Sequence, residues 1–196
     1  MKSVFVFLSL LCLAPVCWAD DNMPTPKAFS SVVYGGPVVR ITTLNQRFAT
    51  ILGLHMGLIA DHRLTLGLGG YGVATQFNEP DGYPGEKLSM FYAGCIAGYI
   101  HKYHRTVHST IHFLVGGGMV SRTTSSPLRS VRGTPDAFFV IEPATNLEFN
   151  VTDAFQMEAG IGYRSVTGVT SFGVADADLS GPTVSLAFKF GRFKTK

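Results

Sequence analysis

Apolar and polar residues alternate with a period of two in one segment of this chain after another, and this pattern constrains the fold more than any other feature. Near the C-terminus, for example, Val184, Leu186 and Phe188 alternate with Thr183, Ser185 and Lys189. Because successive side chains of a β-strand point to opposite faces, the pattern predicts strands with one apolar face. We predict eight strands, at residues 32–43, 47–60, 63–77, 88–103, 107–120, 137–150, 154–167 and 181–193.

The two faces of these strands differ in a way that favours a membrane. The apolar face is large and aromatic, while the other face carries many glycines and few charges; the chain is 46% hydrophobic, 12% aromatic and only 15% charged, with 22 glycines. A soluble β-barrel, which is the alternative, would turn its apolar face inward and a charged face outward. Leu, Phe and Val suit lipid and small polar residues suit a narrow lumen, so we predict an all-β, eight-stranded antiparallel up-and-down transmembrane barrel.

The connections between the predicted strands fall into two classes. Tight turns lie at 61–62, 104–106 and 151–153, whereas the connections at 78–87, 121–136 and 168–180 are long and rich in Gly, Pro, Ser and Asp. Only the first connection, 44–47, is short although it lies at the end of the barrel that carries the long connections. Short turns at one end and long loops at the other predict both termini on the periplasmic side of an outer membrane.

The N-terminus predicts export. An apolar run from Val4 to Val16 follows Lys2, and Ala19 precedes two aspartates, which is typical of a signal peptide cleaved after Ala19. The run is too short for a transmembrane helix, which needs about 20 apolar residues. We therefore divide the chain into a signal peptide (1–19), a lead-in (20–28) and a barrel (29–196), in which Cys95 is the single cysteine.

Three motifs support a family resemblance: Tyr34–Val39 (YGGPVV), Gly57–His62 (GLIADH) and Gly67–Gly72 (GLGGYG). They resemble an uncharacterised family of small bacterial outer-membrane β-barrel proteins, similar in architecture to the eight-stranded transmembrane domain of outer membrane protein A. The resemblance implies location in the outer membrane of a Gram-negative bacterium, with membrane lipid and the assembly machinery as partners. It supplies no catalytic residues. Barrels of this kind often end on an aromatic residue, whereas here three residues follow Phe193.

The sequence offers little enzyme chemistry. No His-x-Ser spacing places a base and a hydroxyl on one strand face, because His108 and Ser109 are adjacent. His108 and His112 share a face but lie about 13 Å apart along the strand, too far for one metal ion, although His55 from another strand could approach them. We predict that the three histidines are polar lumen residues, with no catalytic site, no metal and no cofactor. A net charge of +3 is too balanced to suggest nucleic acid.

Six charged residues fall on the predicted lumen face: Arg40, Glu142, Glu148, Glu158, Arg164 and Lys189. Three positive and three negative charges in a narrow barrel should pair, because unpaired buried charges are costly. The predicted strand directions place Glu148, Glu158 and Lys189 in the lower, periplasmic half of the lumen. They place Arg40, Glu142 and Arg164 in the upper half. We expect Glu158 and Lys189, on neighbouring strands, to pair first.

These residues predict a plugged lumen and a structural or surface-interaction role. A small-solute channel is the alternative, and a lipid-modifying outer-membrane enzyme is less favoured because the dyad is missing.

Overall fold

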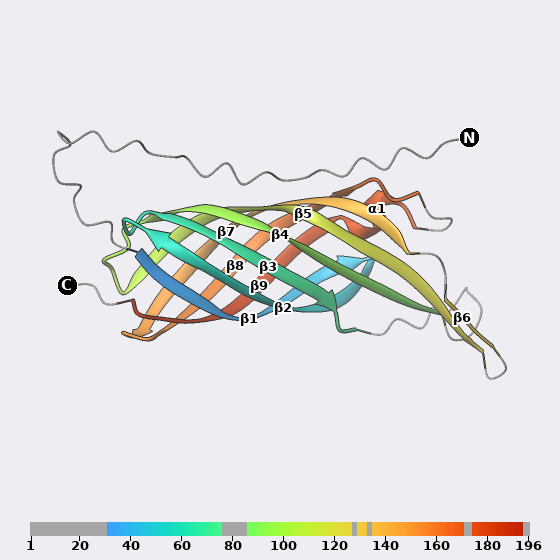
Figure 1. Cartoon of the computed structure of the whole chain (residues 1–196), viewed down its shortest axis with the longest axis horizontal. Helices are drawn as coiled ribbons and strands as arrows, with labels where there is room; N and C mark the ends of the chain where they lie inside the picture. The colour runs from blue at the N-terminus through green and yellow to red at the C-terminus, as the bar shows by residue number, and fades with distance from the viewer. Residues whose placement is uncertain (1–30, 76–85, 127–128, 133–134, 171–173, 194–196) are drawn as a thin grey trace, which may run out of the picture.

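The computed structural model describes residues 31–75, 86–126, 129–132, 135–170 and 174–193. Within them, eight long strands form the wall of a barrel (Figure 1). These strands are β1 (Ser31–Leu44), β2 (Arg47–Ala60), β3 (Leu64–Val73), β4 (Glu86–His101), β5 (Val107–Ser126), β7 (Asp136–Thr152), β8 (Phe155–Thr167) and β9 (Gly181–Gly191). A short strand, β6 (Arg129–Arg132), and a one-turn helix, α1 (Asp176–Leu179), lie in the long connections. The predicted signal peptide and lead-in lie outside the described residues.

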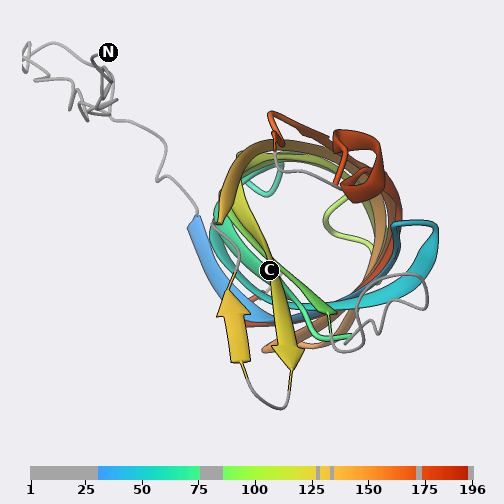
Figure 2. The same cartoon turned by 90° about the vertical axis from the view of Figure 1, so that its right-hand side faces the viewer.

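Each wall strand pairs in antiparallel fashion with its neighbours along the chain, and β1 pairs with β9 to close the ring. Figure 2, which looks along the barrel, shows the closed ring of strands. Closure leaves no free edge in the wall, so the backbone groups of every wall strand find partners on both sides. The predicted eight-stranded antiparallel barrel is confirmed.

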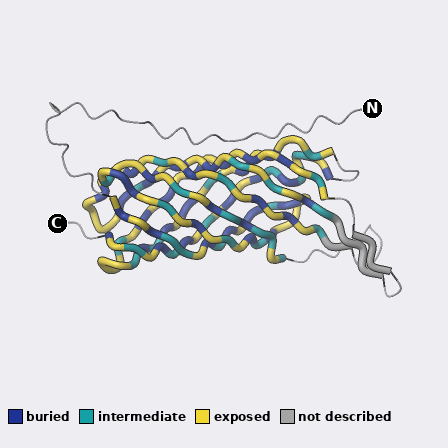
Figure 3. Tube along the Cα trace, in the orientation of Figure 1, coloured by how far each residue is buried: buried dark blue, intermediate teal, exposed yellow. Residues whose placement is uncertain are grey.

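Side chains alternate between a buried lumen face and an exposed outer face, which appears as stripes in Figure 3. The exposed face is the apolar one: Phe48 is 80% exposed, Val33 73% and Ile161 67%. Isolated apolar side chains are common on soluble proteins, but a band of them around a whole barrel marks a surface that meets lipid. The prediction of an apolar exterior is therefore confirmed.

No helix in the described part of the chain is long and apolar enough to cross a membrane.

The two ends of the barrel differ as the loop lengths predicted. At one end lie both ends of the barrel chain and the tight turns β2–β3, β4–β5 and β7–β8; we call it the short-turn end. The other end carries the longer connections, together with the first hairpin, whose turn residues Asn45 and Gln46 have φ of 47° and 60°. Two left-handed residues in succession form the type I′ turn that suits the twist of a hairpin, which explains this short connection on the long-loop side.

The long-loop end carries two elements that alternation did not predict. Strand β5 continues past the barrel and pairs with β6 from Thr123–Arg132 to Ser126–Arg129, so a hairpin projects from the rim (Figures 1 and 2). Helix α1 lies in the β8–β9 connection and is bonded to the first hairpin, where the Asn45 amide donates to the Asp178 carbonyl over 2.8 Å.

Candidate functional site

Strand register gathers the charged lumen residues into two groups. In the lower group, near the short-turn end, Glu148 on β7 stands directly opposite Glu158 on β8, which places two carboxylates side by side. Lys189 on β9 pairs in register with Gln156, two residues from Glu158 on the same face. Side chains diagonal to one another on neighbouring strands can touch, so Lys189 reaches Glu158 on β8. It also reaches Glu148 on β7, across the narrow lumen.

The ammonium of Lys189 is the centre of this lower group. Its Nζ lies 2.5 Å from Glu158 Oε2 and 2.9 Å from Glu148 Oε1. Glu148 also accepts a hydrogen bond from Thr110 Oγ1 at 2.6 Å, and its other oxygen lies 3.1 Å from His108 Nε2. The side chains of the lysine and the two glutamates are each at most 6% exposed, so these charges are compensated by one another and not by bulk water.

The upper group, toward the long-loop end, centres on Arg40 of β1. Its guanidinium Nη1 lies 2.7 Å from Glu142 Oε1 and donates to the Tyr92 hydroxyl at 3.0 Å. That hydroxyl donates in turn to Glu142 Oε2 at 3.1 Å. The guanidinium carbon also sits 3.7 Å from the centre of the Tyr71 ring, which stacks on Tyr92 at 5.0 Å. One cation, one carboxylate and two aromatic rings therefore fill the barrel at this level.

Arg164 departs from the expectation that all six charges form ion pairs. It lies near α1 at the long-loop end, and among the described residues no carboxylate is within ion-pair distance of it. Its Nε donates to the carbonyl of Leu179 at 2.8 Å and its Nη2 to Thr42 Oγ1 at 3.2 Å. The reason is that α1 folds back over the mouth and presents a backbone carbonyl to the guanidinium, which alternation along a strand cannot predict.

Apolar side chains surround the upper charged group and lie beyond the lower one. At the long-loop end, Leu179 of α1 is fully buried and belongs to a cluster with Leu44, Ile51 and Leu114. At the short-turn end, Phe193 is 3% exposed and packs with a second cluster. That cluster consists of Val32, Tyr34, Ile59, Ile100, Tyr103 and Phe193.

The three lumen histidines do not come together. His108 belongs to the lower group, His112 Nδ1 accepts a hydrogen bond from Asn146 Nδ2 at 2.8 Å, and the ring of His55 meets Tyr34 edge to face at 5.6 Å. Over the described ranges, no three His, Cys, Asp or Glu side chains form a group that could hold a metal ion. Ser109 lies on the outer face while His108 faces the lumen, so the two form no dyad.

The inward tyrosines are lumen residues that the alternation pattern did not predict. An alternation pattern counts tyrosine as an apolar residue. The positions of three tyrosines along their strands nevertheless place them on the polar face: Tyr34, Tyr71 and Tyr92. The signal was available: Tyr71 shares its face with Gly67 and Gly69. A Cβ on Gly69 would lie 2.5 Å from the Tyr71 hydroxyl, so this glycine leaves room for the ring.

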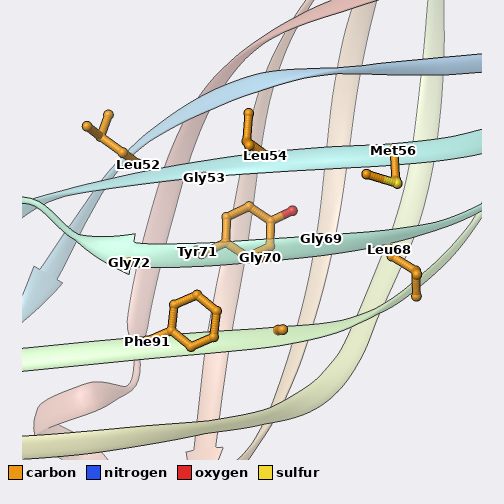
Figure 4. A pocket seen from close by; sticks show the side chains of 11 residues that line it. Leu52, Gly53, Leu54, Met56, Leu68, Gly69, Gly70, Tyr71, Gly72 and Phe91 are labelled. Carbon is orange, nitrogen blue, oxygen red and sulfur yellow. The ribbon is translucent and has the colours of Figure 1, made fainter.

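Glycines also shape the outer wall. Gly70 and Gly72 of β3 face outward and leave a shallow apolar groove of about 770 Å³, which Leu52, Met56 and Phe91 border (Figure 4). Cys95 faces outward as well, as a free and exposed thiol. Since both lie on the wall that meets lipid, they extend the membrane-facing surface and add no polar chemistry to it.

No protein-family profile matches this chain, and neither does any curated protein sequence. Similar solved structures do exist. Neisserial surface protein A (NspA) superposes with a TM-score of 0.57 at 11% identity, over 84% of this chain and 99% of that one. Ail, the attachment invasion locus protein of Yersinia pestis, gives a TM-score of 0.51 at 14% identity, over 82% of this chain and 97% of its own. The chain therefore has the fold of the small eight-stranded outer-membrane β-barrels.

Proposed function

We propose that this chain is a small bacterial outer-membrane protein that acts through its surface, as a structural or interaction protein, and does not conduct solutes through its lumen. One observation carries the proposal. Two layers of buried ion pairs cross the lumen, Arg40–Glu142 above and Lys189–Glu148–Glu158 below. One apolar cluster surrounds the upper layer, and another lies beyond the lower layer.

Energetics support a closed lumen. An eight-stranded barrel is only wide enough inside for its own side chains. A solute would have to separate Lys189 from its carboxylates or Arg40 from Glu142. Separating either buried pair would leave its charges without their partners in a narrow lumen, which opposes a continuous aqueous path.

The outer surface supports residence in a membrane. Near the short-turn end, the ring of Phe155 stacks with that of Phe188, with ring centres 6.2 Å apart. The centre of the Phe190 ring lies 5.1 Å from that of Phe155. Aromatic rings form girdles of this kind at the membrane interfaces of outer-membrane barrels. We propose that these rings meet lipid, and that the outer-membrane assembly machinery acts on this C-terminal strand. Cleavage after Ala19 would make Asp20 the first residue of the membrane-bound form, which N-terminal sequencing tests.

The long-loop end supports the interaction role. The β5–β6 hairpin projects beyond the barrel rim, and the pairing of β4 with β5 continues to Glu86–Thr124, so three strands extend past the wall. Elements that project from a barrel rim can contact a partner at the cell surface. The printed names of two barrels of this fold, a surface protein and an attachment invasion locus protein, describe such roles for those proteins. The loop at 78–87, predicted to contribute here, lies almost entirely outside the described residues.

A small-solute channel is the second candidate, and a specific observation favours it. Several buried polar atoms of the lumen have no hydrogen-bond partner among the described residues, including His55 Nε2, Gln156 Oε1 and Arg164 Nη1. Buried polar atoms of this kind commonly bind water, and a chain of waters could carry small solutes or ions.

Swelling of proteoliposomes in an arabinose solution distinguishes the two candidates. Under the proposal, vesicles that contain the folded protein swell no faster than protein-free vesicles. The matched variant Lys189→Ala removes the central cation of the lower group, so a swelling rate that rises above the baseline only in this variant would support closure by the ion pairs. Rapid swelling with the unaltered protein would favour the channel and overturn the closed lumen.

A further inference from the structure

A polar pocket lies outside the lumen, at the short-turn end, between the β2–β3 and β4–β5 turns. Its volume is about 450 Å³, and Asp61, His62, Arg63, Tyr99, Lys102 and His104 contribute to its lining. Backbone hydrogen bonds hold the two turns together: the Ile100 amide donates to the Arg63 carbonyl at 2.7 Å. The pocket is thus built from a fixed pair of turns and falls within the size range of small-molecule sites, about 300–1,000 Å³.

The pocket has charges of both signs. Arg63 and Lys102 are cations, Asp61 is a carboxylate, and all three side chains are exposed. His62 and His104 add ring nitrogens, with their ring centres 5.6 Å apart. Two cations with imidazole donors suit the oxygens of a phosphate, while a carboxylate suits an ammonium group. This combination matches a ligand that carries both a phosphate and an amine.

The pocket also adjoins the lipid-facing wall. Tyr99 lines it and is 49% exposed on the outer face, opposite Leu64, which is 53% exposed. Tyrosines and basic residues gather where a membrane protein meets lipid headgroups. A ligand in this pocket could therefore place its polar end between the turns and its acyl chains along the wall.

Tyr103 separates this pocket from the lumen. Its ring lies 4.8 Å from that of His62 on the pocket side and 5.6 Å from that of His108 in the lower lumen group. Burial raises the pKa of the Tyr103 phenol, so the ring forms a neutral wall. The pocket is closed toward the lumen and open toward the rim, as a headgroup site requires.

We propose that this pocket binds the headgroup of a phospholipid that carries a primary ammonium, the phosphate against Arg63 and Lys102 and the amine against Asp61. The inference rests on the proposed membrane location, with the short turns in the periplasmic leaflet. The proposal is that the pocket binds this class of phospholipid specifically, and not only that such lipids surround the barrel in the membrane.

Native mass spectrometry of the full-length folded protein in maltoside micelles tests the proposal. Dimyristoyl phosphatidylethanolamine should bind with one site, at least tenfold more tightly than dimyristoyl phosphatidylglycerol, which has the phosphate but no amine. Inorganic phosphate should bind at least tenfold more weakly than the ethanolamine lipid. Equal binding of the two lipids would overturn the proposal, and so would phosphate binding as tight as lipid binding, which would make this a plain phosphate site.

Variants assign the two halves of the headgroup. Arg63→Gln with Lys102→Asn should weaken phosphatidylethanolamine binding at least tenfold, and Asp61→Asn should remove the preference over phosphatidylglycerol. Asp61 and Lys102 have φ of 48° and 57°, which asparagine tolerates, so these changes should leave the turns folded. Arg192→Gln, an exposed cation at the same end but outside the pocket lining, is the matched control and should not change binding.

The outcomes separate this inference from the proposed function. A protein that folds and inserts into vesicles but shows no lipid preference overturns the pocket assignment alone. A protein that does not insert overturns both.

Discussion

The sharpest prediction concerns the lower lumen group, where one lysine serves two carboxylates. Lys189→Met should destabilise the barrel by about 3–5 kcal/mol, because Glu148 and Glu158 would then face each other without a cation. Glu158→Gln should cost less, about 1.5–3 kcal/mol, because Lys189 keeps Glu148 and a charge-assisted hydrogen bond contributes about that much. The two changes together should cost less than their sum by about 1 kcal/mol or more, since in the double variant Glu148 keeps its bonds from Thr110 and His108.

Reversible urea unfolding in lipid vesicles measures these free energies. The single tryptophan, Trp18, lies in the predicted signal peptide, so far-UV circular dichroism and the heat-dependent shift of gel mobility replace tryptophan fluorescence. The control cycle combines Lys189→Met with Glu142→Gln, which share no hydrogen bond or ion pair in the described structure; it should be additive to within about 0.5 kcal/mol. Strict additivity of the Glu158–Lys189 cycle would mean that the two side chains do not interact, and would overturn the Lys189–Glu158 ion pair.

Two further predictions test the packing and the orientation. Gly69→Ala should destabilise the barrel by about 1–3 kcal/mol because its Cβ would lie 2.5 Å from the Tyr71 hydroxyl, whereas the neighbouring Gly70→Ala, whose nearest contact is 3.9 Å away, should be neutral in the same urea assay. In a chain that lacks Cys95, Ser125→Cys in the β5–β6 hairpin should react with a membrane-impermeant maleimide on intact cells and Thr152→Cys at the short-turn end should not; the reverse pattern would invert the topology.

Periodicity predicted most of the wall because the membrane imposes it. A strand that meets lipid on one side and a narrow lumen on the other must alternate, so β7 and β9 could be recognised from residues such as Phe149 and Glu148 or Phe190 and Lys189. The halves of the lumen followed from strand direction alone, and the structure places Glu148, Glu158 and Lys189 together in the lower one. The β5–β6 hairpin was missed because a hairpin beyond the membrane has no lipid-facing side and so no strict alternation.

The partners of individual lumen residues were less predictable. Arg164 bonds to the Leu179 carbonyl because α1 folds back over the mouth, and no local pattern in a loop encodes that position. Tyr71 and Tyr92 were overlooked because a tyrosine is apolar in a pattern and polar at its hydroxyl. Which carboxylate meets which cation depends on register between strands, and register follows from the whole ring of pairings and not from one segment.

Single-channel recording in a planar lipid bilayer tests the closed lumen most directly, because small ions can pass through a narrower path than any other solute. The folded protein should insert without producing discrete conductance steps, since both ion-pair layers and both apolar clusters lie across the path. The variant Phe193→Ala, which opens only the short-turn mouth, should be equally silent because both charged layers remain. Stable conductance steps from the unaltered protein, reproduced in independent preparations, would contradict the account and make the channel its function.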